Sequence, residues 1–393
     1  MTASGALAIG VIVAAVGPAR ASAIACGSTI TASVRLTEDL NCTADTTGSG
    51  ITIGADGVTV NLNGYQILGP GDLAGTYGIA DTGYSDVTIE YGAMSNFGTD
   101  VDLMGASGSE LTGIVVRHLT IANTGVQDGF GVYGEHLSGT IIHRLSISNA
   151  YVGVELVSCQ HSAVTHNYLQ DPFYGGYDGT GTANRWAHNT LSDVTYQGIV
   201  AASTADAVIR DNTVNGAGAY GIEDQGSDGV TIAQNVLNDL YDGVYDFASS
   251  DGNISYNTGS GDTYGIDTYA LTGYAYAGNT FENGQYGIET DLPTSEILSG
   301  NVTSNNSEAG LFVYTGGAAG WSAMLSYNTG NDNSFGLYSQ IPTSGTGNRA
   351  SGNMKVNCYN VICVTSAAAA GRVRSPAYRP PAAMAIPAPR ARH

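Results

Sequence analysis

Residues 220–244, YGIEDQGSDGVTIAQNVLNDLYDGV, decide the fold because the stretch ends almost as it begins. Tyr-Gly-Ile opens it and Asp-Gly-Val closes it, so two glycines stand 22 residues apart. The same glycine recurs at intervals of 22 or 23 residues, at Gly131, Gly153, Gly176, Gly198, Gly221, Gly243, Gly265, Gly287 and Gly310. An internal repeat of this length is typical of a solenoid.

A series of asparagines runs in step with the glycines. Its members are Asn167, Asn189, Asn212, Asn235, Asn257, Asn279 and Asn301, followed less regularly by Asn328 and Asn353. Apolar residues stand three positions before most of these asparagines and, in many repeats, two positions after them, as Ile232 and Leu237 do around Asn235. Apolar residues that alternate around one polar, turn-forming residue predict a strand, a corner and another strand.

Each repeat therefore holds about three strands of three to five residues, none of which buries an apolar face alone. Stacked as coils about 4.8 Å apart, the strands form parallel sheets whose inward side chains make one continuous core. Inward asparagines then bond from coil to coil and satisfy the backbone groups of the corners. The sequence predicts an all-β, right-handed parallel β-helix of about 22 residues per coil, with three short sheets and an asparagine ladder.

A leucine-rich repeat is the alternative fold. Residues 230–237, VTIAQNVL, also fit its L-x-L-x-x-N-x-L core. That fold needs a further leucine-bearing segment on its convex side, whereas here the remaining apolar positions form another short strand after the glycine. The β-helix is therefore favoured.

The repeats and the N-terminal stretch 26–71, from CGSTITASVRL to NGYQILGPG, resemble secreted right-handed parallel β-helix proteins of the pectin-lyase-like superfamily. The resemblance spans residues 26–365. It implies the fold, but the group includes polysaccharide lyases, hydrolases and epimerases, phage tailspikes, adhesins and accessory proteins of metal-enzyme maturation. The fold by itself therefore selects none of these activities.

The regions outside the repeats differ in composition. Residues 1–23 contain an apolar run, 6–17, too short to span a bilayer and followed by small residues, which predicts a signal peptide and an exported protein without a membrane span. A lipid-modified Cys26 is the alternative, disfavoured because Ala23 fits the first position of a lipobox poorly. Residues 24–57 are expected to form an N-terminal cap, 58–365 the helix, and 366–393 a disordered tail rich in Ala, Pro and Arg. We expect a monomer.

Five cysteines fit an oxidising compartment. Their positions predict two terminal disulfides, Cys26–Cys42 and Cys358–Cys363. Cys159 is left over, and we expect it to be a small buried side chain rather than a reactive thiol.

The residues two positions after the repeat glycines are predicted to form an outward row. The row is Tyr133, Glu155, Asp178, Val200, Glu223, Tyr245, Asp267, Glu289, Phe312 and Tyr338, with Asp224, Asp246 and Asp291 nearby. Aromatic faces pack on sugar rings and carboxylates accept bonds from hydroxyls, so the row predicts a polysaccharide-binding surface. Its predicted substrate contacts are Tyr133, Glu155, Asp178, Tyr245 and Phe312.

Three acids of this row are candidate catalytic residues. Asp267 and Glu289 are expected one coil apart, close to the ~5 Å of a retaining glycosidase pair. Glu223 and Asp267 are expected two coils apart, close to the ~6.5–9.5 Å of an inverting pair. The same oxygens could instead bind Ca²⁺, or the row could be an acidic, solvated face that keeps the sheet from pairing with others.

A second row precedes the corner asparagines. His143, His166 and His188 are predicted on consecutive coils, where their imidazoles could share a metal ion or supply a base. Ordinary solvent-facing histidines are the alternative.

The charge of the chain limits the class of ligand that it could bind. The net charge is -21, and no Lys or Arg lies between Arg210 and Arg349 although sixteen Asp and Glu do. Such a surface repels nucleic acids and uronic-acid polymers unless Ca²⁺ bridges the two, so the predicted partner is a neutral or calcium-bridged polysaccharide.

The sequence contains few motifs of known polysaccharide-degrading enzymes. The polygalacturonase motifs are absent, and RSPAYR at 374–379, which fits a pectate-lyase motif, falls in the predicted tail. We expect an exported β-helix protein that binds an extracellular polysaccharide and hydrolyses, eliminates or epimerises it. The alternative is a non-catalytic structural or adhesive solenoid.

Overall fold

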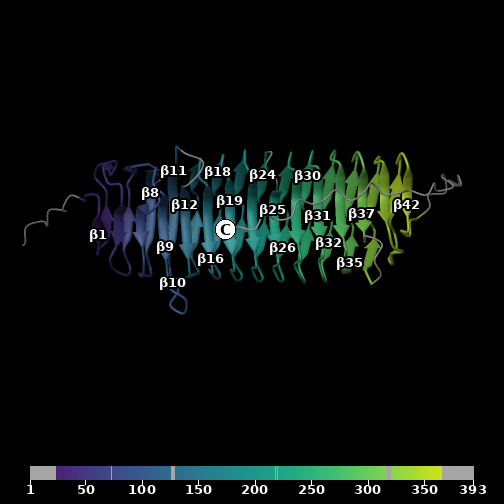
Figure 1. Ribbon diagram of the computed structural model, residues 1–393, viewed down its shortest axis with the longest axis horizontal. Coiled ribbons are helices and arrows are strands. Elements are labelled where there is room, and N and C mark those ends of the chain that lie inside the picture. The colour runs from purple at the N-terminus through teal and green to yellow at the C-terminus, as the bar shows by residue number, and fades with distance from the viewer. Residues whose placement is uncertain are drawn as a thin grey trace, which may run out of the picture.

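The computed structural model describes residues 24–71, 73–124, 129–216, 218, 220–315 and 320–364. The predicted signal peptide and C-terminal tail lie outside the described residues. Every element of the described chain is a β-strand, and the strands stack into an elongated rod along which the chain advances from one end to the other (Figure 1). No helix long and apolar enough to cross a bilayer occurs in this part of the chain.

One wall of the rod is a parallel sheet of fifteen strands, called the long sheet below. Its strands, in order, are β1 (Ser28–Ile30), β4 (Gly48–Ile53), β7 (Thr76–Asp81), β9 (Thr99–Met104), β12 (Phe130–Glu135), β16 (Val152–Val157), β19 (Tyr174–Gly179), β22 (Gln197–Ala202), β25 (Tyr220–Gln225), β28 (Asp242–Phe247), β31 (Tyr264–Tyr269), β34 (Tyr286–Asp291), β37 (Ala309–Tyr314), β40 (Phe335–Ser339) and β42 (Val356–Tyr359).

The second wall, called the first short sheet, contains mostly three-residue strands. They are β2 (Val34–Arg35), β5 (Thr59–Asn61), the first part of β8 (Thr88–Ser95), the first part of β11 (Val115–Ala122), β14 (Ile141–His143), β17 (Ala163–Thr165), β20 (Arg185–Ala187), β23 (Val208–Arg210), β26 (Thr231–Ala233), β29 (Asn253–Ser255), β32 (Ala275–Ala277), β35 (Thr294–Ser299) and β38 (Ser322–Ser326).

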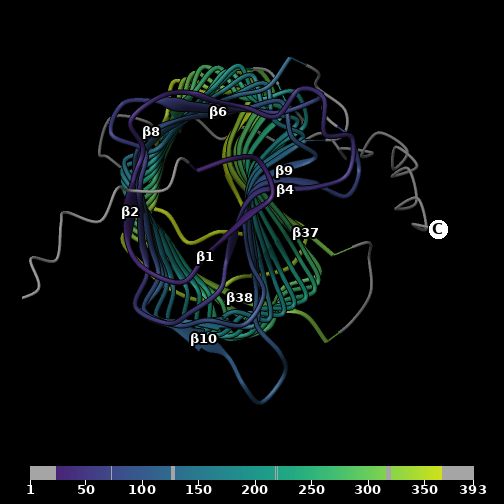
Figure 2. The ribbon, with the colours of Figure 1, turned by 90° about the vertical axis from the view of Figure 1, so that its left-hand side faces the viewer.

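The third wall, the second short sheet, follows each corner. It comprises β3 (Leu40–Asn41), β6 (Gln66–Leu68), the last parts of β8 and β11, β15 (Ser146–Ser148), β18 (Tyr168–Gln170), β21 (Thr190–Ser192), β24 (Thr213–Asn215), β27 (Val236–Asn238), β30 (Thr258–Ser260), β33 (Thr280–Glu282), β36 (Val302–Ser304), β39 (Thr329–Asn331) and β41 (Arg349–Ser351). Two further strands, β10 (Leu111–Thr112) and β13 (Leu137–Ser138), pair with each other. The three walls enclose the core in cross-section (Figure 2), which confirms the predicted parallel β-helix.

The opening stretch of sequence supplies one residue to the core from each wall. Ile222 in β25, Ile232 in β26 and Leu237 in β27 are almost completely buried. Each such side chain contributes about 1.5–3 kcal/mol of burial free energy, and the coils above and below provide its neighbours. A single coil could not bury them.

The asparagine ladder forms at the corner between the two short sheets. Asn257 donates from Nδ2 to Asn279 Oδ1 (3.0 Å) and to the carbonyl of Ile232 (2.9 Å). Its own Oδ1 accepts from the backbone N–H (3.0 Å) and Nδ2 (2.9 Å) of Asn235. The ladder runs from Asn167 through Asn328, as predicted, and continues at Asn348. Asn353 instead joins a second, shorter ladder with Asn333 and Asn306 at another corner.

Disulfides join the predicted cysteine pairs at the two ends of the described helix, Cys26–Cys42 and Cys358–Cys363. The predicted cap is itself part of the coil, because β1 pairs with β4 in the long sheet. Cys159 is free and buried, and burial raises the pKa of its thiol to about 12, so it carries no thiolate for chemistry.

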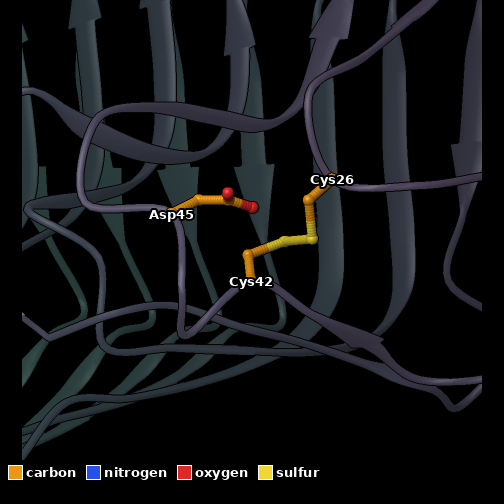
Figure 3. Close-up of side chains that lie close together, drawn as sticks. All are labelled: Cys26, Cys42 and Asp45. Atoms are coloured by element: carbon orange, nitrogen blue, oxygen red, sulfur yellow. A yellow bond between two sulfur atoms is a disulfide. The ribbon is translucent and has the colours of Figure 1, made fainter.

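One trio of metal-ligating side chains stands out in the described part of the chain. The donor atoms of Cys26, Cys42 and Asp45 lie within 4.8 Å of one another (Figure 3). Both sulfurs are bonded to each other, so neither is a thiolate and the trio offers a metal only one carboxylate.

The inward row of the long sheet changes from apolar to polar in the middle of the rod. Leu156 is followed, strand by strand, by Asp178, Ala201, Asp224, Asp246, Thr268 and Thr290. Tyr274 donates its hydroxyl to Asp224 Oδ2 (3.1 Å), and Thr290 donates to Glu296 Oε2 (2.7 Å). Asp224 and Asp246, predicted to lie near the outward row, therefore face the interior.

These buried acids are expected to make the protein most stable in acidic solution. Burial raises the pKa of Asp224 to about 6 and the pKa of Glu296 and Asp262 to about 8, against about 4 in an unfolded chain. A raised folded pKa contributes stability that is complete below the unfolded pKa and is lost as pH rises through the folded one. The melting temperature should therefore fall from about pH 4 to about pH 8.

A matched pair of variants tests the source of this loss. Burial, followed by repulsion from Asp224, raises the pKa of Asp246 well above its ordinary value, so Asp246→Asn should raise the melting temperature at the alkaline end and reduce its fall with pH. Asp206→Asn, at an exposed corner, should leave the profile as it is. Equal profiles for wild type and Asp246→Asn would assign the loss to other groups.

Candidate functional site

The register of the long sheet defines its outward row. The row runs Tyr133, Glu155, Tyr177, Val200, Glu223, Tyr245, Asp267, Glu289, Phe312 and Tyr338. Nine of the ten predicted members are in place. The exception is Asp178.

Asp178 points into the core instead of outward. It pairs with Leu156, is 1% exposed, and accepts from Asn184 Nδ2 (3.0 Å) and Trp186 Nε1 (3.2 Å). Two consecutive glycines caused the difference, because Val154 pairs with Gly176 and the repeat glycine of this coil is therefore Gly175. A count from the wrong glycine shifts the strand by one residue, which exchanges its two faces. Tyr177 occupies the outward position.

Four carboxyl groups gather on the outer face of the long sheet, and we call them the acidic cluster: Asp242, Asp267, Glu289 and Asp291. Asp267 in β31 and Glu289 in β34 are direct partners on adjacent strands. Asp291 follows Glu289 by two residues on the same strand, and Asp242 lies on β28, the strand before β31. Asp242 is absent from the predicted row because it stands at the first position of its strand.

Burial and mutual repulsion raise the pKa values of these acids above their usual range. Burial raises the pKa of Asp267 to about 6, and burial together with the charge of Asp267 raises the pKa of Asp291 to about 7. The pKa of Glu289 is raised well above its ordinary value by burial, then by Asp291 and Asp267. The pKa of Asp242, which is 1% exposed, is raised by burial and then by Asp267. No Lys or Arg lies between residues 210 and 349 to oppose these shifts.

Three oxygens of the acidic cluster are buried without a hydrogen-bond partner in the part of the chain that the structure describes. Glu289 Oε2, Asp242 Oδ1 and Asp291 Oδ1 have no hydrogen-bond partner among the described residues. Buried polar atoms are normally satisfied, and those that are not often mark a functional site or an absent ligand. The cluster thus contains unsatisfied carboxyl oxygens just beneath the outer face of the long sheet.

Aromatic rings flank the acidic cluster along the sheet. Tyr264 stacks on Tyr286 with ring centroids 4.9 Å apart, and Tyr220 stacks on Tyr245 at 4.7 Å. Further along, Phe312 stacks on Tyr338 at 5.1 Å. Tyr220, Tyr264 and Tyr286 occupy the same strand position as Asp242, so they escaped the sequence prediction for the same reason.

Glu223 lies at the edge of this arrangement. It is 8% exposed and is separated from Asp267 by Tyr245, which pairs with both. The predicted Glu223–Asp267 pair would therefore have a tyrosine between its members. Asp267 and Glu289 have no residue between them in the row.

The three predicted metal-binding histidines are not in one row. His143 pairs with Thr165 in β17, whereas His166 and His188 are corner residues whose equivalent in the earlier coil is Arg144. The imidazoles of His166 and His188 stack at 4.8 Å, and His143 faces His118 at 5.5 Å. Within the described chain these three donors form no compact set such as that of Cys26, Cys42 and Asp45. The metal site stays a prediction.

Comparison with known proteins shows which proteins have a similar fold. A family model described as "Right handed beta helix region" matches residues 178–329. A search of curated proteins finds no match. Among solved structures, the catalytic unit of a thermostable GH87 alpha-1,3-glucanase from Streptomyces thermodiastaticus strain HF3-3 superimposes with a TM-score of 0.56 and 12% identity over 76% of this chain. This chain covers 62% of the glucanase unit.

Two further structures share the fold. A tailspike protein of E. coli bacteriophage HK620, a double mutant in complex with a pentasaccharide, has a TM-score of 0.51 and 11% identity, over 86% of this chain and 74% of its own. A double mutant of a periplasmic alginate epimerase has a TM-score of 0.50 and 14% identity, and the match covers 80% of this chain and 77% of the epimerase chain. Identities this low show the fold alone. By its parallel sheets and the family match of its central coils, this chain is a right-handed parallel β-helix protein.

Proposed function

We propose that this protein hydrolyses a neutral polysaccharide at the acidic cluster on the outer face of the long sheet. The observation that carries the proposal is the pairing of Asp267 with Glu289 on adjacent strands, without a neighbouring cation and between stacked tyrosines. Two carboxyl groups in such proximity are the chemical requirement of most glycosidases.

The two acids differ in the way that glycosidic cleavage requires. Glu289, whose pKa is raised well above its ordinary value by burial and by the charges of Asp291 and Asp267, donates its proton to the glycosidic oxygen as the bond to the anomeric carbon breaks. Asp267, whose pKa is about 6, is ionised above that pH and attacks the anomeric carbon. Water, deprotonated by the Glu289 carboxylate, then displaces Asp267 from the sugar and restores both groups.

The strand spacing favours a retaining outcome. Partners on adjacent parallel strands lie about 4.8 Å apart at their backbones, which is near the ~5–5.5 Å between carboxyl groups of retaining enzymes. Asp291, next to Glu289 on the same strand, adds negative charge that favours the protonated form of Glu289, and Asp242 lies on the strand before the pair. They are positioning residues in this proposal.

The surrounding surface supports a sugar ligand that carries no negative charge. Tyrosine faces such as those of Tyr245 and Tyr264 can pack on sugar rings, and uncharged hydroxyls can donate to the partly exposed carboxyl groups of Asp267 and Glu289. A uronate polymer would meet only like charge here unless Ca²⁺ bridged it. The glucanase and the pentasaccharide-bound tailspike are the fold relatives whose names agree with this ligand class. Export through a signal peptide at 1–23 would bring the site to such polymers.

A glycan panel tests the proposal. The full chain is incubated with neutral glucans, mannan and xylan, and with alginate and polygalacturonate, each with Ca²⁺ or with a chelator. We expect new reducing ends from a neutral polymer, unaffected by chelation, and proton NMR should show a first product with retained anomeric configuration. An unsaturated product would indicate elimination and overturn hydrolysis, and a chelator-sensitive reaction on uronates would overturn the choice of ligand.

A non-catalytic, glycan-binding solenoid is the second candidate. The regular spacing of 22 or 23 residues through the coils of β25–β34 favours it, because no long insertion beside these strands builds a wall around the acidic cluster. This candidate predicts retention on one of the same polymers without any change in reducing ends. The panel therefore distinguishes the two functions.

A further inference from the structure

A row of basic and aromatic side chains follows the corner between the two short sheets, on five consecutive coils. We call it the cationic ridge: Tyr91, His118, Arg144, His166 and His188, flanked on the neighbouring strands by Arg35, Arg117, His143 and Arg210. In the cross-section this corner, which lies within β8, is across the rod from the long sheet (Figure 2). The ridge is therefore separate from the acidic cluster.

The side chains of the ridge contact one another along the rod. Tyr91 stacks on His118 with ring centroids 4.8 Å apart, and Arg144 Nη1 lies 3.3 Å from His118 Nε2. His166 stacks on His188, also at 4.8 Å. The rings and the guanidinium thus form an ordered edge whose rungs repeat at the coil spacing of about 4.8 Å.

The backbone does not explain these residue types. All five corner positions have a left-handed conformation, with φ between 53° and 57°. Glycine, asparagine and aspartate are the residues that this conformation favours. Further along the same corner the chain uses Asp211, Gln234, Tyr256, Gly278, Gly300 and Tyr327, so a phenol there is not confined to the ridge. Imidazole or guanidinium side chains at four positions in succession, from His118 to His188, require another reason.

The ridge is positive in a protein of net charge -21. Glu90 pairs with Arg117 (2.6 Å), and Asp211 lies 3.7 Å from Arg210 and 3.8 Å from His188. Arg35 and Arg144 are exposed and form no ion pair with a described carboxylate. At the N-terminal end of the ridge an open hollow is lined by Arg35, Asn61, Asn63, Gly64, Tyr91 and His118. Unneutralised guanidinium groups beside an amide-lined hollow are a recognition surface for anions.

We infer that the cationic ridge is a second glycan site, which holds a linear polysaccharide bearing carboxylate or sulfate groups parallel to the rod without cleaving it. Arginine binds both groups through its planar fork, and the stacked rings offer faces for sugar rings. The ridge is one side chain wide, which suits a single extended chain better than a protein partner needing about 800 Å².

Charge spacing favours a glycan over a nucleic acid. A uronate or sulfated polymer carries about one or two charges per sugar, which a row with one basic rung per coil can meet. Double-stranded DNA carries one charge per ~1.7 Å, and its field would also act on the strongly negative remainder of the rod. Duplex DNA is therefore the competing ligand in the test.

The test uses the full chain and a triple variant, Arg144→Asn, His166→Asn and His188→Asn. Asparagine tolerates the left-handed corner, so the melting temperature should be preserved. Binding to heparin oligosaccharides and to polygalacturonate oligosaccharides is measured at low and high salt. We expect wild type to bind at least one of them, and the triple variant to bind it at least about tenfold more weakly with a shallower salt dependence.

Two control variants separate this site from the rest of the corner and from the acidic cluster. Gln234→Asn with Tyr256→Asn, on the same corner further along, should leave the binding unchanged. Glu289→Gln should also leave it unchanged, because that residue lies across the rod. The inference is overturned if wild type binds neither anionic oligosaccharide, if the triple variant binds as tightly as wild type, or if duplex DNA of equal charge binds more tightly than the glycans.

Discussion

Replacing Glu289 by glutamine is expected to lower the turnover number on the cleaved glycan by about a thousandfold, within the range measured for loss of a general acid. Glutamine is no general acid, yet it has the shape of the protonated carboxyl that the raised pKa of Glu289 favours. The coil should therefore fold with unchanged or slightly higher stability, and KM should change little. Initial rates of reducing-end release, with a melting curve of the same sample, check both parts.

A substrate with a good leaving group shows whether the loss has the proposed cause. An aryl glycoside whose phenolate leaves without protonation needs no general acid, so Glu289→Gln should cleave its first bond at nearly the wild-type rate. Asp267→Asn should be inactive on both substrates, because it removes the nucleophile. Glu282→Gln, on β33 in the second short sheet, is the matched control and should keep full activity. Equal loss on both substrates would assign Glu289 another role.

The fold could be predicted because two residue types mark every coil. Each repeat glycine lies against the next coil, where an added Cβ at Gly265 would stand 2.5 Å from the carbonyl oxygen of Gly287 and 2.3 Å from the ring of Phe281. Each ladder asparagine satisfies backbone groups that nothing else at the corner reaches. Such requirements are local, so they recur in the sequence at the length of one coil.

The register errors have a different origin. Some coils have 23 residues instead of 22, and the number of residues between two repeat glycines does not show where in the coil the extra residue lies. At Gly175 and Gly176 the sequence offers two glycines, and only the pairing with Val154 shows which one is equivalent to the others. The equivalence of Arg144 and His166 was missed for a similar reason. The coil of Arg144 has Leu145 in place of the ladder asparagine, so the sequence lacks the landmark from which the corner is counted.

Asp242 escaped prediction because the long strands do not alternate strictly. In β25, Tyr220 and Glu223 face outward although two residues lie between them, and both of these, Gly221 and Ile222, are buried. A two-residue period places one of these outward positions in the core. The acidic cluster therefore combines three outward strand positions: the first, held by Asp242 and missed by the prediction, the fourth, held by Asp267 and Glu289, and the sixth, held by Asp291.

Asn257→Ala is expected to cause the largest loss of stability among the substitutions considered for this protein, about 3–5 kcal/mol. The variant leaves the carbonyl of Ile232 and the backbone N–H of Asn235 buried without their partners, and it interrupts the ladder between Asn235 and Asn279. Each buried, unsatisfied group costs about 1–3 kcal/mol, so the sum exceeds the loss of any one hydrogen bond. Urea titration followed by circular dichroism measures the difference.

Asn238→Ala, in the preceding coil, is the matched control. Its side chain makes one partly exposed hydrogen bond, to Asn215 Oδ1 (3.0 Å), and touches no backbone group of the ladder, so its loss should cost less than about 1 kcal/mol. Because each coil contacts only its neighbours, Asn257→Ala should also weaken the coils on both sides first and broaden the unfolding transition. If both alanine variants cost the same, the asparagine ladder is a consequence of the stacked corners and not a cause of their stability.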